Sequence, residues 1–314
     1  MAIGFIGKRL SAAGLSLATG SIKYLEIEGK AGDLSLARSA EARVEGMAVE
    51  QEMIADVQSL ESHLLDIKDA LGGSWARSVV LGMPSRDVLL RIVEMPPMEI
   101  EDAREALKWD FDKYFPFPCA EATFDLGVVA TPGDSDRENQ KYIVAAARMH
   151  VVQSLLDIAR KVGISAEAVE PVNVALFRCT RGMIPRPAMG SMVVSVGRNS
   201  SQIVVGYEDN GILYRTLLVG GEASSGSGES FAAVAREVSS TFTYLGSQFR
   251  EMKVEEIVLG GDYAEDQSLK DAIESVASIP VILSDPWSMW GIRGAPEKST
   301  GWESSIGLAV RSLL

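Results

Sequence analysis

The sequence predicts a duplicated α/β fold with a cleft between its two halves. The prediction depends on two stretches with the same pattern, Gly14 to Gly29 and Val193 to Gly211. Each contains an alternating apolar strand, a turn of small residues, a second alternating strand and a closing glycine. Alternation with a period of two around a Gly, Asn or Ser cluster is typical of a β-hairpin. Because one such hairpin opens each half of the chain, both halves are expected to share one fold.

The turns of these hairpins have two interpretations, and the pattern leaves both open. Small residues let backbone N–H groups approach an anion closely, so two facing turns would form a phosphate clamp. Alternatively, Gly and Asn provide only the positive φ of an ordinary tight turn. Aligning the hairpins places four pairs of residues opposite each other: Ser16 and Ser195, Ala18 and Gly197, Gly20 and Asn199, Ser21 and Ser200.

The net charge of the chain limits the kinds of molecule that it is expected to bind. The 314 residues include 30 Lys or Arg against 43 Asp or Glu, which gives a net charge of −13 at pH 7. This charge argues against general nucleic-acid binding and against adsorption to an anionic membrane, and it fits a basic protein partner. A chain of this length is expected to form two domains.

Cysteine and histidine spacing excludes a recognisable zinc site. Cys119 and Cys179 are not part of a CxxC motif, and His63 and His150 lie far apart. We therefore expect structural thiols and the reducing cytoplasm as the compartment. No apolar run reaches the ~18 residues of a membrane span. Residues 1–14 carry their basic residues after their apolar ones, so we expect a short tail and not a signal peptide.

Strands and helices are predicted in a regular order. After the first hairpin, a strand is expected near 34–44. A helix is expected over 50–71, because apolar residues recur every three or four positions and Gly72-Gly73 follows. Residues 78–162 then predict a compact ββαββα unit. Its elements are strands at 79–83 and 87–95, a helix over 100–114, strands at 123–130 and 141–147, and a helix over 151–162.

The second half begins with a crossover at 185–188 and the second hairpin. Residues 217–222 lead into a loop at 223–228 that is flexible by composition. Apolar residues from Phe231 to Phe249 form a helical stripe, which indicates core packing. The remaining elements are a buried strand at 256–261, a helix over 271–277, a strand at 281–283, a loop-rich stretch with Trp287, Trp290 and Trp302, and a helix over 306–314.

Several segments resemble a known family. They are Leu81 to Glu99 (LGMPSRDVLLRIVEMPPME), Lys108 to Pro118 (KWDFDKYFPFP), Val162 to Arg178 (VGISAEAVEPVNVALFR), Phe249 to Gly261 and Gly307 to Arg311. They resemble the type IV pilus assembly protein PilM family of the actin-like superfamily, which has the cell-division protein FtsA as a relative. The resemblance covers nearly the whole chain.

The resemblance implies an actin-like (ribonuclease H-like) two-lobed fold with an inserted ββαββα subdomain. The expected parts are subdomain 1A at 1–77 and 163–188, inserted subdomain 1C at 78–162, subdomain 2A at 189–222 and 254–300, a reduced subdomain 2B at 223–253, and a C-terminal helix at 301–314 that returns to 1A.

The resemblance also implies partners. Family members lie at the cytoplasmic face of the inner membrane and bind the N-terminal tail of a single-span protein, PilN, in a groove between 1A and 1C. For this chain we expect a PilN-like partner, further pilus platform or motor proteins, no nucleic acid and no direct membrane insertion. Because a strand end and a turn face the boundary of 1A, four residues are expected near the groove: Pro84, Ser85, Arg86 and Arg91.

The family also binds ATP in its central cleft, where this chain departs from the family motifs. Ser16 and Ser195 replace the aspartates that organise Mg²⁺ and the attacking water, Ala18 replaces a glycine, and Asp262 stands where a small residue is expected. A serine carries no charge, so metal binding is expected to weaken. The other expected nucleotide contacts are Thr19, Gly20, Ser21, Lys23, Gly197, Asn199, Ser200, Ser201, Gly260 and Gly261.

These observations lead to three hypotheses. The first is a scaffold of the type IV pilus inner-membrane platform, with weak or absent binding of ATP and Mg²⁺ and no hydrolysis. The second is an active ATP-binding switch or ATPase of the same fold, and a related type II secretion or competence system is an alternative setting. The third is a sugar-kinase-like enzyme. For catalysis only Glu222 is a candidate carboxylate, and the alternative interpretation, a solvated loop residue, is favoured over it.

Overall fold

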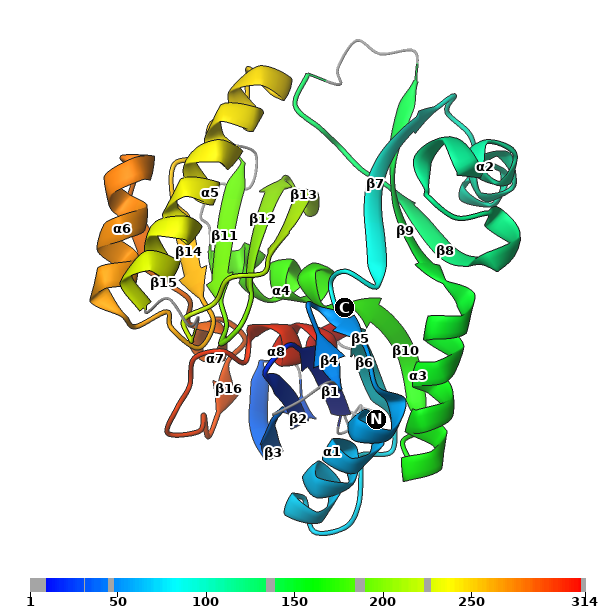
Figure 1. Cartoon of the computed structure of the whole chain (residues 1–314), viewed down its shortest axis with the longest axis vertical. Helices are drawn as coiled ribbons and strands as arrows, with labels where there is room; N and C mark the ends of the chain where they lie inside the picture. The colour runs from blue at the N-terminus through cyan, green and yellow to red at the C-terminus, as the bar shows by residue number, and fades with distance from the viewer. Residues whose placement is uncertain are drawn as a thin grey trace, which may run out of the picture.

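A six-stranded sheet and a five-stranded sheet form the centres of two lobes, and five strands of the first follow the same order as the five of the second (Figure 1). In the first sheet, β1 pairs with β2 antiparallel and with β6 parallel, and in the second sheet β11 pairs in the same way with β12 and β14. These five strands of the first sheet are β1 (Leu10–Ala18), β2 (Ser21–Lys30), β3 (Asp33–Arg43), β6 (Val79–Met83) and β10 (Ala166–Pro171). Those of the second are β11 (Ser191–Val196), β12 (Ser201–Tyr207), β13 (Asn210–Leu217), β14 (Ile257–Gly260) and β15 (Val281–Leu283). The predicted duplication is confirmed.

The structure is a computed structural model that describes residues 10–30, 32–44, 48–133, 139–183, 190–222 and 227–311. Four expectations therefore fall wholly or partly outside the described residues. They concern the N-terminal tail, the crossover at 185–188, the loop at 223–228 and the end of the helix expected over 306–314.

The helix expected over 50–71 begins later than predicted. A short hairpin, β4 (Val49–Glu50) and β5 (Met53–Ile54), precedes helix α1 (Val57–Ala70). The Asp56 carboxylate accepts hydrogen bonds from the N–H groups of Gln58 and Ser59, so it caps the helix there. The prediction of a helical start at Glu50 was wrong, because the apolar period continues through Met53 while the backbone turns back on itself.

A third sheet, with strand order β7-β9-β8, is separate from the sheets of the two lobes (Figure 1). Its elements are β7 (Val88–Met95), α2 (Ile100–Tyr114), the short helix η1 (Cys119–Glu121), β8 (Ala122–Val128) and β9 (Gln140–Arg148). The predicted ββαββα order is present along the chain. Its outer elements join the first lobe, however: β6 lies between β1 and β10, and α3 (Met149–Val162) packs its apolar residues into the first core.

In the second lobe a long helix and a shorter one pack into the same core against the sheet. Helix α5 (Ser227–Gln248) buries Phe231, Val234 and Val238 against Met192 and Val194 of the sheet. The described part of the expected subdomain 2B is therefore continuous with the second lobe, and the boundaries of the named subdomains stay predictions. The lobe also contains α6 (Gln267–Ala277), which lies beside α5 in Figure 1.

The last segments of the chain return to the first lobe. They are α7 (Pro286–Met289), β16 (Ile292–Arg293) and α8 (Glu303–Val310). Strand β16 adds a sixth strand beside β3, and Trp287, Trp302 and Ile306 cover one face of the first sheet. Helix α8 packs against α4 (Val172–Thr180), which is followed by the short helix η3 (Arg181–Met183). The two helices α8 and α4 are so close that a Cβ on Gly307 would overlap the Ala175 carbonyl oxygen.

Candidate functional site

The turns of the two hairpins meet at the boundary between the lobes. Gly20 has φ +91°, and a Cβ there would overlap Oδ1 of Asn199 in the facing turn. Most of the expected nucleotide contacts lie around one small cavity of about 70 Å³. It is lined by Ser16, Ala18, Thr19, Ser21, Lys23, Ser195, Gly197, Ser200, Gly261 and Asp262, together with residues that the sequence did not single out.

The other residues that were expected to contact a nucleotide lie beside the cavity and do not line it. Gly20 and Asn199 contact each other, and the Ser201 hydroxyl donates to the Val219 carbonyl at 2.6 Å. Gly260 lies against the Glu303 side chain, where a Cβ would be 2.8 Å from a carboxylate oxygen. The structure therefore brings the two turns and the end of β14 together around one cavity.

A buried ion pair joins the two lobes inside the cleft. The Lys23 ammonium lies 2.7 Å from the Asp262 carboxylate and donates to the Gly301 carbonyl at 2.8 Å. The Lys23 ammonium also lies 5.5 Å from the centre of the Trp302 ring and 3.9 Å from the Glu41 carboxylate. The lysine expected to contact phosphate is thus surrounded by groups of the chain itself.

Glu52 lies between the two turns, a position that sequence reasoning missed. Its side chain is fully buried. One carboxylate oxygen accepts hydrogen bonds from the Thr19 N–H at 2.8 Å and from the Ser200 hydroxyl at 2.7 Å. Its position along the chain soon after the first hairpin was the available clue. The apolar period over 50–71 predicted a helix there instead, so this position was not recognised.

Arginines and carboxylates close the rim of the cleft. The Arg198 guanidinium lies 2.7 Å from Glu222 and 3.6 Å from Glu41, and Arg43 lies 2.8 Å from Glu222. Glu222, the only candidate catalytic carboxylate, is therefore held by two arginines. The Tyr263 ring packs on Gly221, where a Cβ would overlap it.

Ser16, one of the two serines that replace the expected aspartates, makes neutral contacts. Ser16 and Ser305 share a hydrogen bond of 2.7 Å, and the Ser305 hydroxyl donates to the Lys23 carbonyl at 3.2 Å. The nearby Glu303 is buried and accepts from the Gly261 N–H at 3.2 Å. Burial raises the pKa of Glu303, with opposing contributions from its hydrogen bonds and from Lys23.

The cavity between the two turns is much smaller than a typical ligand pocket. Pockets for ligands of drug size have volumes of ~300–1,000 Å³, and the cavity measures about 70 Å³. Within the described ranges, no cluster of three or more His, Cys, Asp or Glu side chains could hold a metal ion.

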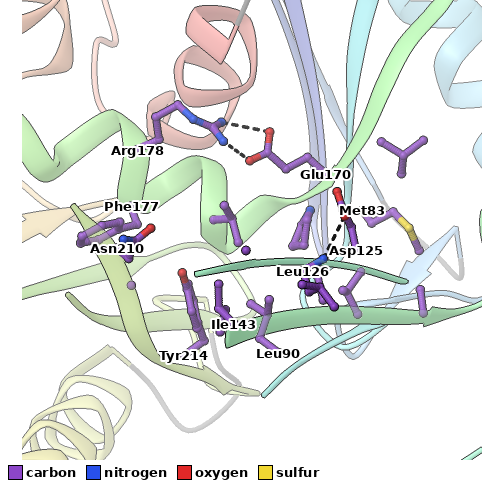
Figure 2. Close-up of a pocket in the computed structure, with 18 of the residues that line it drawn as sticks. Met83, Leu90, Asp125, Leu126, Ile143, Glu170, Phe177, Arg178, Asn210 and Tyr214 are labelled. Carbon is purple, nitrogen blue, oxygen red and sulfur yellow. Dashed lines mark hydrogen bonds and ion pairs between the residues drawn. The ribbon is translucent and has the colours of Figure 1, made fainter. Parts of the chain in front are cut away.

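A much larger cavity, about 560 Å³, lies between the first lobe, the third sheet and β13 (Figure 2). We call it the groove. Strands β7 and β9 contribute alternate residues to it, whereas β8 contributes the five consecutive residues from Thr123 to Gly127. Alternation indicates that the groove faces one side of β7 and β9, while the consecutive run indicates that it follows the edge of β8. The groove-lining residues of β7 and β9 are Val88, Leu90, Ile143, Ala145 and Ala147.

Charged groups also line the groove. Glu170 forms an ion pair with Arg178 in Figure 2 and lies 3.4 Å from the Arg311 guanidinium. The Asp125 carboxylate accepts from the Leu126 N–H at 2.9 Å and lies 2.6 Å from Arg104. Tyr214 lines the groove as well, and burial raises its pKa.

The four expected partner-binding residues do not line this groove. Pro84 and Ser85 are buried, and the Ser85 hydroxyl accepts hydrogen bonds from Gln202 and Thr216, each at 2.9 Å. Arg86 and Arg91 are exposed and donate to backbone carbonyls nearby. Pro84, Ser85 and Arg86 lie on the turn between β6 and β7, outside the groove. Arg91 lies in β7 next to Leu90, which lines the groove, and its side chain points to the other face of the strand.

Comparison with known proteins identifies the family. The family model described as type IV pilus assembly protein PilM matches residues 14–227, which is more than half of the chain. The chain belongs to the PilM family. The resemblance noted in the sequence is confirmed, and so is the two-lobed actin-like fold.

Solved structures agree with this fold. The structure described as a PilM-PilN type IV pilus biogenesis complex matches with a TM-score of 0.81 and 20% identity over 97% of this chain and 99% of that chain. The ethanolamine utilization protein EutJ from Carboxydothermus hydrogenoformans matches with a TM-score of 0.53 and 11% identity over 96% of this chain and 89% of its own. None of the curated protein sequences compared is significantly similar to the chain. In the described part of the chain, no helix is both long and apolar enough to cross a bilayer.

Proposed function

We propose that this PilM-family chain is a scaffold of type IV pilus assembly that binds the N-terminal tail of a PilN-like membrane protein in the groove. The observation that carries the proposal is the 560 Å³ groove between the first lobe and the third sheet. A solved complex of the PilM and PilN proteins has the same fold over nearly the whole chain. The partner would hold the chain at the cytoplasmic face of the inner membrane.

The shape of the groove favours an extended peptide. Strand β8 pairs only with β9 in the third sheet, so its other edge has no strand partner among the described residues. Apolar side chains of β7 and β9 form the adjoining wall. An extended segment lying along a strand edge places alternate side chains toward such a wall.

The cleft supports a scaffold better than an ATPase. Ser16 and Ser195 provide no carboxylate to hold Mg²⁺ or to orient water, and the cavity between the turns has only about 70 Å³. We therefore propose that the chain does not hydrolyse ATP and that its lobes act mainly to present the groove.

A single substitution at Gly127 tests the groove. Nothing lies within 4 Å of the position that a Cβ of Gly127 would occupy, and its φ is not positive. Gly127→Val should therefore fold and place its side chain into the groove. The matched control is Val128→Thr at the neighbouring residue, which is 50% exposed and does not line the groove.

The measurement is calorimetric binding of a synthetic peptide with the sequence of the cognate PilN-like tail. We expect binding by the parent and by the control, and at least about tenfold weaker binding by Gly127→Val, which is a loss of about 1.4 kcal/mol or more. Equal affinity of all three proteins contradicts this location of the peptide. Absence of binding by the folded parent contradicts the proposed partner.

A further inference from the structure

We propose that the cleft between the lobes is occupied by groups of the chain itself. The Glu52 carboxylate occupies the position between the two turns where a bound anion would lie. Beside it, Lys23 is engaged by Asp262 and not by a phosphate, and Asp262 is engaged by Lys23 and not by a metal cation. Any nucleotide must displace both. The inference concerns the cleft and is independent of the peptide groove.

The backbone that presents Glu52 is in an unfavourable conformation. Gln51 has φ 49° and Glu52 has φ 58°, so both central residues of the β4–β5 turn are left-handed. Such turns favour Asn-Gly or Gly-Gly, because a side chain crowds the backbone at positive φ. A strained turn of this kind persists where surrounding contacts hold it.

Those contacts involve Glu52 on every side. Its backbone N–H donates to the Thr19 hydroxyl at 2.7 Å, while its carboxylate accepts from the Thr19 N–H and from the Ser200 hydroxyl. The second carboxylate oxygen lies 3.4 Å from the Ser85 hydroxyl. Glu52 is therefore fixed to both hairpins at once.

The donors that hold Glu52 are the types that hold a phosphate. One is a backbone N–H of the first hairpin turn, and another is a hydroxyl of the facing turn. Anions are bound by such turn amides, and hydrogen bonds to a charged acceptor are shorter and stronger than neutral ones. Donors of the two facing turns thus converge on one point, and the Glu52 carboxylate occupies it.

The lysine of the cleft is similarly occupied. An ammonium group has three donors, and Lys23 directs them toward Asp262, the Gly301 carbonyl and, at 3.9 Å, Glu41. The Asp262 side chain is 6% exposed. The aspartate that departs from the family motif therefore neutralises the lysine that remains from it.

This arrangement separates two explanations for weak nucleotide binding. If the absence of carboxylates at Ser16 and Ser195 were the whole cause, replacing both by aspartate would be enough to restore affinity. If the cleft is occupied from within, that double replacement is not enough and removal of the Glu52 carboxylate is required.

The test compares Mg²⁺-ATP binding by calorimetry in four proteins: the parent, Ser16→Asp/Ser195→Asp, Glu52→Gly and Gln51→Gly. Glu52→Gly removes the carboxylate and relieves a left-handed residue, so it is expected to fold. Gln51→Gly relieves the neighbouring left-handed residue without removing a charge, which makes it the matched control. We expect at least about tenfold tighter binding for Glu52→Gly alone, the scale of losing one charged competitor.

Three results would overturn the proposal. One is micromolar Mg²⁺-ATP binding by the parent. Another is equal affinity of Glu52→Gly and Gln51→Gly when both show a cooperative melting transition. The third is restored binding in Ser16→Asp/Ser195→Asp alone. A second variant, Glu52→Gln, removes the charge and keeps the size, and its Thr19 amide resonance should shift from its position in the parent if that N–H faces the carboxylate.

Discussion

The Lys23 ammonium lies 2.7 Å from the Asp262 carboxylate, although the two residues are 239 positions apart in the chain. Their side chains are only 4% and 6% exposed. Removing one member of a buried pair leaves an uncompensated charge, which costs ~3–5 kcal/mol. The pair therefore joins the first hairpin to the end of β14 across the boundary between the lobes.

The first prediction concerns this pair. Asp262→Ala should lower the free energy of unfolding by about 3 kcal/mol, and adding Lys23→Met should recover part of that loss because no charge then remains buried alone. Urea titration of the single and double variants measures both effects. Lys298→Ala is the control, since that side chain is 55% exposed and lies 3.6 Å from the same carboxylate. A loss by Asp262→Ala no larger than that of the control contradicts the prediction.

The second prediction concerns the crossing of α4 and α8. A Cβ on Gly307 would overlap the Ala175 carbonyl, so Gly307→Ala must push the helices apart and should lower the unfolding free energy by about 1–3 kcal/mol. Gly246 lies in α5 with nothing within 4 Å of its Cβ position. Gly246→Ala should therefore raise stability by about 0.5–1 kcal/mol. Effects of the same sign in thermal unfolding would contradict this packing.

The third prediction concerns pH. Burial, aided by the nearby Glu52 charge, raises the pKa of Asp87 to about 6, against opposing effects of the Ile54 N–H, Arg86 and His150. The folded protein thus holds this proton more tightly than the unfolded chain. The resulting stability is fully present below about pH 4 and is lost as the pH rises through about 6, by up to roughly 3 kcal/mol.

Asp87→Asn isolates that contribution. The amide oxygen can still accept from the Ile54 N–H, which lies 2.8 Å from the native carboxylate, and it does not titrate. Unfolding free energies between pH 4 and 7 should show a difference between parent and variant that grows with pH in favour of the variant. A constant difference over this range would show that Asp87 ionises as it does in the unfolded chain.

The fourth prediction concerns the two thiols. Cys179 is fully buried, and burial raises the pKa of its thiol well above the usual value. The thiolate is the reactive form, so Cys179 should be inert in the native protein while the partly exposed Cys119 reacts. A colorimetric thiol assay should count one thiol before denaturation and two after it. In Cys119→Ser, rapid native reaction of the remaining thiol would contradict the burial of Cys179.

The repeated architecture could be predicted because its determinants are local. Alternating strands around turns of small residues identified both hairpins, and the helical stripe from Phe231 to Phe249 identified α5. No local sequence pattern indicates that β6 pairs with β1 and β10, because a short buried strand has the same apolar sequence in whichever sheet it lies. This is why β6 was assigned to the inserted unit.

The occupied cleft could not be predicted for a related reason. Glu52 reaches the cleft from a left-handed turn without Asn or Gly, which the usual turn patterns do not indicate. The groove combines side chains from both lobes and the third sheet, so no single stretch of sequence shows it. The expected nucleotide and partner contacts remain predictions until binding is measured.

The position of α8 and β16 has a consequence for how the protein is made. One apolar face of the first sheet, including Ala12, Leu25 and Ile27, is covered by Trp287, Ile292 and Trp302 near the other end of the described chain. During synthesis on the ribosome, that face of the first strands therefore stays uncovered until the segment that contains Trp287, Ile292 and Trp302 has emerged. At an elongation rate of ~5–20 residues per second, that interval lasts many seconds, and it makes the nascent first lobe a natural client for chaperones.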